Sequence, residues 1–202
     1  MNQLILSHAR GPTDRPLLDL TLGALLDRSV QLHPENDALV SRHQGLRYSY
    51  REFLVEVEQC ARALLAIGLK KGDRIGIWSP NYAEWSILQF GSSKIGAILV
   101  NINPAYRLAE LEYALNVSGC RALVTAERLK TSMYLQMLQT LAPELATCAP
   151  GELKCAKLPA LQWVIRLGSE ATPGMLNYDA LLERGTALAP GIDGFDVEQD
   201  II

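Results

Sequence analysis

The chain has 202 residues, a length that suits one ordinary domain or one lobe of a larger protein. Its 49% of hydrophobic and 20% of charged residues are typical of a globular protein and exclude an intrinsically disordered one. The formal net charge of -3 gives no attraction to nucleic acid, and no apolar stretch approaches the roughly 20 residues that would span a membrane.

Residues 1–48 predict a helix followed by a hairpin. The N-terminus has neither a basic leader nor a long apolar segment, so we expect no signal peptide and a cytoplasmic protein. The helix is expected to begin after Thr21, a residue type that caps helix N-termini, and to end at Pro34. Two short apolar stretches, residues 38–41 and 46–48, flank a polar turn and predict the hairpin.

Residues 49–202 predict an incomplete α/β subdomain. Ser49 and Glu52 form a capping box for a helix that ends near Gly68. The apolar run at residues 97–101 has strand length and no alternation, so we expect burial on both of its faces. Since helices connect successive strands, we predict an α/β fold with a mostly parallel sheet and flanking helices. The other expected strands are residues 74–78, 121–125, 161–167 and 200–202. One helix is expected to begin at residues 79–81, and three more are expected at 108–117, 129–141 and 178–184. Residues 142–159 are expected to form a surface loop.

Polar and aromatic residues stand at or just beyond the carboxyl ends of two predicted strands. In an open parallel sheet, ligands bind beyond these ends, which meet along one edge. We therefore predict that Trp78, Asn81, Asn103 and Tyr106 line a substrate crevice. An alternative interpretation is that the asparagines only end strands and cap helices, and that the tryptophan serves packing.

Motifs of catalysis and cofactor binding are missing from this sequence. It contains no GxGxxG and no GxxxxGK[ST], so neither a dinucleotide-binding protein nor a P-loop NTPase is indicated. The three histidines are not spaced for a metal ion, and the four cysteines form no CxxC pair. We therefore predict no metal site and no catalytic residue within the chain. We also predict reduced thiols, with a disulfide between Cys148 and Cys155 as the alternative.

Four blocks of the sequence resemble a known family in their order and spacing. They read TLGALLDRSVQLHPENDALV, LRYSYREF, KKGDRIGIWSPNYAEW and GAILVNINPAYRLAELEYALNVSGCRALVT. Together they resemble the N-terminal part of the large domain of AMP-forming acyl-CoA synthetases, which belong to the adenylate-forming superfamily. With the later LPALQWVI, the resemblance is closest to the branch that acts on medium-chain fatty acids.

The resemblance implies a parent enzyme that uses ATP, Mg²⁺ and coenzyme A. Such a ligase activates a carboxylate, here a fatty acid, to an acyl-adenylate and transfers the acyl group to coenzyme A. The family's phosphate loop, adenine-site motif, ribose-binding aspartate and C-terminal lysine do not occur in these residues. We expect the chain to end before the phosphate loop, to be inactive alone and to bind none of these cofactors tightly.

Two further expectations concern association and alternative function. A truncated domain would expose apolar sheet edges that the complete domain covers, which predicts homo-oligomers of this chain. The alternative to a ligase fragment is a stand-alone, non-catalytic α/β binding or interaction module derived from the same scaffold.

Overall fold

A computed structural model describes residues 11, 12, 14 and 16–187. Its N-terminal part consists of helix α1 (Leu22–Leu32) and the antiparallel strands β1 (Asp37–Ser41) and β2 (Leu46–Ser49). The Thr21 hydroxyl accepts a hydrogen bond from the backbone N–H of Ala24 at 3.1 Å, as expected of an N-cap. Helix and hairpin are therefore confirmed, while the predicted division at residue 48 stays a prediction.

Helix α2 (Tyr50–Ala66) begins with the predicted capping box. The side chain of Ser49 accepts from the N–H of Glu52, and the Glu52 carboxylate accepts from the N–H of Ser49 at 2.8 Å. The Ser49 hydroxyl also donates to this carboxylate at 2.8 Å, and the two bonds that the carboxylate accepts, from the N–H and the hydroxyl of Ser49, lower the pKa of Glu52. The helix is followed by Gly68, whose φ of 81° lies in the left-handed region that glycine adopts without strain.

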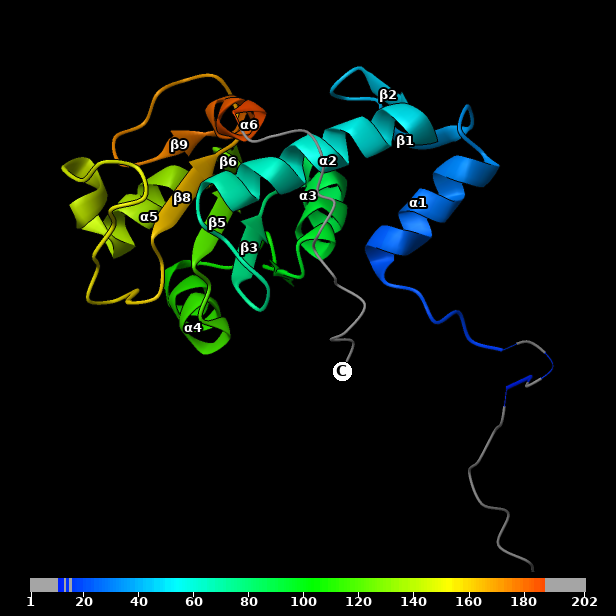
Figure 1. Cartoon of the computed structure of the whole chain (residues 1–202). Helices are drawn as coiled ribbons and strands as arrows, with labels where there is room; N and C mark the ends of the chain where they lie inside the picture. The colour runs from blue at the N-terminus through cyan, green and yellow to red at the C-terminus, as the bar shows by residue number, and fades with distance from the viewer. Residues whose placement is uncertain (1–10, 13, 15, 188–202) are drawn as a thin grey trace, which may run out of the picture.

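A five-stranded parallel sheet forms the centre of the fold and confirms the predicted α/β class (Figure 1). All four pairings between its strands are parallel, in the order β4-β3-β5-β8-β9. β4 therefore lies on one side of β3, and β5, β8 and β9 lie on its other side. The strands are β3 (Arg74–Trp78), β4 (Ile98–Asn101), β5 (Ala122–Thr125), β8 (Trp163–Arg166) and β9 (Leu176–Asn177).

Helices cover both faces of this sheet. One core joins the sheet to α2, α3 (Ala83–Lys94) and α6 (Tyr178–Thr186), and the other joins it to α4 (Leu108–Ser118) and α5 (Tyr134–Leu141). In Figure 1, α2 runs across the sheet, with α3 and α6 beside it. Short elements complete the second side: β6 (Arg128–Leu129), β7 (Ser132–Met133) and a 3-10 helix (Pro143–Ala146).

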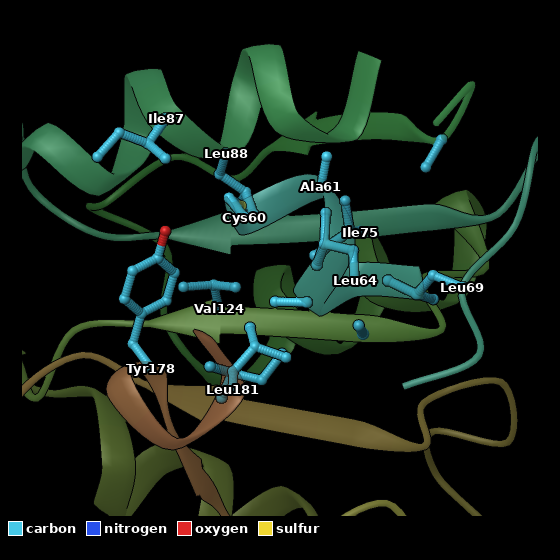
Figure 2. Close-up of a cluster of buried hydrophobic side chains, with 14 of the residues drawn as sticks. Cys60, Ala61, Leu64, Leu69, Ile75, Ile87, Leu88, Val124, Tyr178 and Leu181 are labelled. Atoms are coloured by element: carbon cyan, nitrogen blue, oxygen red, sulfur yellow. The ribbon is translucent and has the colours of Figure 1, made fainter. Parts of the chain in front are cut away.

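The sequence places residues in the two cores by strand alternation. Ile75 and Ile77 of β3 belong to the core with α2, whereas Trp78 belongs to the core with α4 and α5. Figure 2 shows Cys60 and Leu64 of α2 within the first core, together with Ile75. None of the described helices is long and apolar enough to cross a bilayer.

Three predictions about elements are wrong. The strand β4 is not buried on both faces, because it lies at an edge of the sheet, where Ile98 is 52% exposed. Residues 142–159 are not a surface excursion, since Leu145, Leu153 and Leu158 are buried in the second core. The helix expected from residue 129 begins at Tyr134, after the short β6–β7 hairpin. The strand expected at residues 200–202 lies outside the described residues.

Candidate functional site

The strand order creates a crevice at the carboxyl edge of the sheet. The segment after β3 leads to α3 on one face, whereas the segment after β5 leads to α5 on the other face. Where the connections from two neighbouring strands leave to opposite faces of the sheet, as those from β3 and β5 do, the strand ends separate, and α/β proteins bind ligands at such points. A cleft of about 480 Å³ lies here, lined by His43, Gln44, Tyr82, Glu84, Glu127 and residues 166–170.

The turn of the β1–β2 hairpin forms one wall of this cleft. His43 stacks on Tyr82, with ring centroids 5.3 Å apart and an angle of 28° between the rings. The side-chain oxygen of Gln44 accepts from the N–H of Ala83 at 2.7 Å, and its amide nitrogen donates to Glu84 at 2.8 Å. Because Tyr82, the N-cap residue of α3, offers no side-chain cap, Gln44 supplies one from a distant part of the chain.

Arg166, the last residue of β8, is the buried cation of the cleft. Its side chain is 4% exposed and donates one hydrogen bond, to the Thr172 hydroxyl at 2.7 Å. The carboxylates of Glu127 and Glu170 lie 3.8 Å and 3.9 Å from its guanidinium nitrogens, longer than a hydrogen bond. Its Nε has no hydrogen-bond partner among the described residues. The guanidinium is thus paired in charge but only partly satisfied in hydrogen bonding.

The four residues predicted from the sequence do not converge on this cleft. Trp78 is fully buried and donates from Nε1 to the carbonyl of Asn103 at 3.1 Å, so these two are joined. Asn81 lines a separate cavity of about 300 Å³ beside the hairpin. Tyr106 lines an apolar cavity of about 480 Å³ on α4. Their contact with a substrate stays a prediction.

Sequence reasoning missed the residues that line the cleft. Glu127 and Arg166 could have been found, because they stand at or just beyond the carboxyl ends of two strands, as the predicted residues do. His43 and Gln44 gave no such signal, because the packing of the hairpin on α2 and α3 brings them to the carboxyl edge of the sheet. Local patterns thus identify one wall of the cleft and not the other.

The charge of this cleft does not fit the phosphate groups of ATP or coenzyme A. The cleft holds three carboxylates, from Glu84, Glu127 and Glu170, against the single cation of Arg166, and this excess of negative charge repels phosphate groups. Within the described part of the chain, no cluster of three or more histidine, cysteine or acidic side chains could hold a metal ion.

The four cysteines are free thiols, as predicted. Burial raises the pKa of Cys60 to about 12 and also raises the pKa values of Cys120 and Cys148. Since the thiolate is the reactive form, these shifts disfavour the nucleophilic state of the three thiols.

Comparison with known proteins identifies the class. The sequence model of the family described as AMP-binding enzyme matches residues 26–179, more than half of the chain, so the chain belongs to this family. Medium-chain acyl-CoA ligase ACSF2, mitochondrial, of Mus musculus is 40% identical over 180 residues, which cover 89% of this chain and 29% of that protein. The ACSF2 protein of Danio rerio is 40% identical over 184 residues, covering 91% and 30%.

A solved structure supports the fold. The N-terminal domain of FACL13 from Mycobacterium tuberculosis superposes with a TM-score of 0.64 at 22% identity, covering 84% of this chain and 37% of that one. The chain spans less than a third of the mouse ligase that it matches.

The prediction of a cytoplasmic protein is wrong. The relatives at about 40% identity are named as mitochondrial ligases, which conflicts with that location. The prediction rested on the composition of the N-terminal residues, and this composition does not determine the compartment.

Proposed function

We propose that this chain is the N-terminal part of an acyl-CoA ligase that activates a medium-chain fatty carboxylate. The ligase would use ATP and Mg²⁺ to form an acyl-adenylate and would transfer the acyl group to coenzyme A. The observation that carries this proposal is the 40% identity to a medium-chain acyl-CoA ligase along 89% of the chain. The match to the AMP-binding family over residues 26–179 agrees with it.

The proposal assigns this part of the ligase a supporting role. Residues 1–202 would neither form the acyl-adenylate nor bind ATP, Mg²⁺ or coenzyme A tightly, because the cleft is rich in carboxylates and the family's phosphate loop is missing from the sequence. Asn81, Asn103 and Tyr106 would line the wall of the acyl or coenzyme A crevice, with Trp78 supporting Asn103 from the core.

Fatty-acid-dependent exchange of pyrophosphate into ATP tests the proposal. We expect no exchange with residues 1–202 and exchange with the product of the complete reading frame when octanoate is supplied. Exchange by residues 1–202 alone would contradict the supporting role. A reading frame that stops after Ile202 would favour the stand-alone binding module instead.

Self-association is the second property that we propose for residues 1–202. The edge strand β4 exposes Ile98, and the outer side of α4 exposes Tyr113 and Val117, which are 70% and 69% exposed. Apolar surface of this kind promotes association when nothing covers it. Light scattering should show dimers or larger species that the Val117→Lys and Ile98→Lys variants diminish, whereas a monomeric unsubstituted chain would refute this property.

A further inference from the structure

The turn between β4 and α4 is tied by its own hydrogen bonds. The carbonyl of Asn103 accepts from the N–H of Tyr106 at 3.0 Å, which closes a β-turn with Pro104 at its second position. The side-chain oxygen of Asn103 also accepts from the N–H of Ala105 at 2.9 Å. The turn thus has a defined conformation, and it carries two of the residues that we assign to the crevice wall.

Two stacked aromatic side chains hold this turn from inside the protein. Trp78 ends β3 and Tyr134 begins α5, and their rings stack with centroids 3.8 Å apart and an angle of 23°. The indole Nε1 of Trp78 donates to the carbonyl of Asn103 at 3.1 Å, and the Tyr134 hydroxyl donates to the carbonyl of Pro104 at 2.6 Å. Both side chains are fully buried, so the two donors are fixed by packing.

The hydrogen bonds of Trp78 and Tyr134 to the turn are not needed to fill the core. Phenylalanine in place of Tyr134 would fill nearly the same volume, and the hydroxyl adds only the bond to Pro104. Burial raises the pKa of Tyr134, so its hydroxyl remains a donor at any physiological pH. Two adjacent carbonyls of one turn therefore receive donors from a strand of the sheet, β3, and from a helix, α5, which fixes the turn relative to the sheet.

We propose that Trp78 and Tyr134 are positioning residues that hold residues 103–106 in the conformation that lines the substrate crevice of the ligase. The proposal rests on the proposed function for its substrate, whereas the restraint of the turn by the aromatic pair can be tested without it. The competing interpretation is that the hydrogen bonds of Trp78 and Tyr134 only satisfy polar atoms in the core and have no effect on substrate binding.

Amide hydrogen exchange on residues 1–202 tests the restraint itself. In Tyr134→Phe, the loss of one hydrogen bond should speed exchange at the amides of Ala105 and Tyr106 roughly 2- to 10-fold. The amide of Gly72, bonded to Gly96 at the opposite edge of the sheet, should not change. Tyr50→Phe is the matched control, because Tyr50 is partly buried at the start of α2 and remote from the turn along the chain. Unchanged exchange at Ala105 and Tyr106 would overturn the proposal.

Steady-state kinetics on the product of the complete reading frame tests the link to the substrate. Tyr134→Phe and Trp78→Phe should raise KM for octanoate or coenzyme A several-fold with little change in kcat, because a displaced wall weakens binding without touching the reacting atoms. Faster exchange with unchanged KM for both substrates would overturn the positioning role and leave the ligase proposal intact. If the complete protein shows no ligase activity, the proposed function fails, and the substrate part of this proposal fails with it.

Discussion

The amino and carboxyl edges of the parallel sheet both carry arginines, but these arginines are satisfied to different degrees. At the amino edge, Arg74 and Arg121 donate to carbonyls at the ends of α4 and α2. At the carboxyl edge, and among the described residues, the only hydrogen bond that Arg166 donates goes to Thr172, and its Nε has no partner. Buried polar groups need partners, so the amino edge is closed by the chain itself, whereas the described residues satisfy Arg166 at the carboxyl edge only in part.

The contacts of Arg74 show how the amino edge is closed. Its Nε and Nη2 donate to the carbonyls of Ser118 and Gly119, both at 2.9 Å, and its Nη1 donates to Gly72 at 3.0 Å. The last carbonyls of a helix lack partners within the helix, and a cation there also interacts favourably with the helix dipole. Arg74 thus joins the beginning of β3 to the end of α4.

The largest expected effect comes from Arg74→Met. The substitution keeps an apolar stem but leaves the carbonyls of Ser118 and Gly119 without a charged donor, so the free energy of unfolding should fall by about 2–3 kcal/mol. Urea unfolding followed by tryptophan fluorescence measures the change. Arg51→Met is the control, because Arg51 pairs with Glu35 at the surface and should contribute less than about 0.5 kcal/mol. Equal losses in the two variants would contradict the special role of the amino edge.

A smaller loss is expected for Gly119→Ala at the same edge. Gly119 has a φ of 62°, and a Cβ there would lie 2.6 Å from Nη2 of Arg74. Backbone strain and displacement of the guanidinium should together cost about 1–2 kcal/mol. Gly45→Ala isolates the strain, because Gly45 has a φ of 69° and nothing within 4 Å of its added Cβ. If the two glycine variants lose the same stability, the contact with Arg74 contributes nothing.

At the carboxyl edge, Gln44→Ala should cost about 1 kcal/mol. It removes the acceptor for the N–H of Ala83 and the donor to Glu84, which together attach the hairpin to α3. The measurement is the same urea titration, with Gln31→Ala on the exposed side of α1 as the control. A change no larger than that of the control would show that these two hydrogen bonds contribute nothing to the attachment of the hairpin.

Much of this architecture is predictable because its causes are local. The capping box at Ser49 and Glu52 and the apolar stripe of α2 lie within single elements, and the structure confirms both. The strand at residues 74–78 also matches its predicted bounds. Alternating helices and strands then imply a parallel sheet, so the fold class follows from short-range patterns.

The remainder depends on strand order and tertiary packing, which no local pattern encodes. The apolar run of β4 resembles a central strand, yet the order of the sheet places it at an edge. The cleft likewise depends on contacts across long sequence distances, such as that between Gln44 and Ala83. For the same reason the four residues predicted to line one crevice lie in different surroundings. Trp78 is buried in the core, whereas Asn81 lines the cavity beside the hairpin.

The smallest effect is expected for Arg166→Met, and it tests the comparison most directly. Methionine removes a buried guanidinium with one hydrogen bond, and the carboxylates of Glu127 and Glu170 remain 51% and 80% exposed to water. Since the cost of burying the charge is removed together with its weak pairing, the free energy of unfolding should change by less than about 1 kcal/mol. Urea unfolding of the Arg166→Met and Arg74→Met variants, measured side by side, compares the two losses of stability. A loss of about 2 kcal/mol or more, which approaches the roughly 3–5 kcal/mol that breaking a buried ion pair costs, would mean that Arg166 is structural and that the two edges are alike.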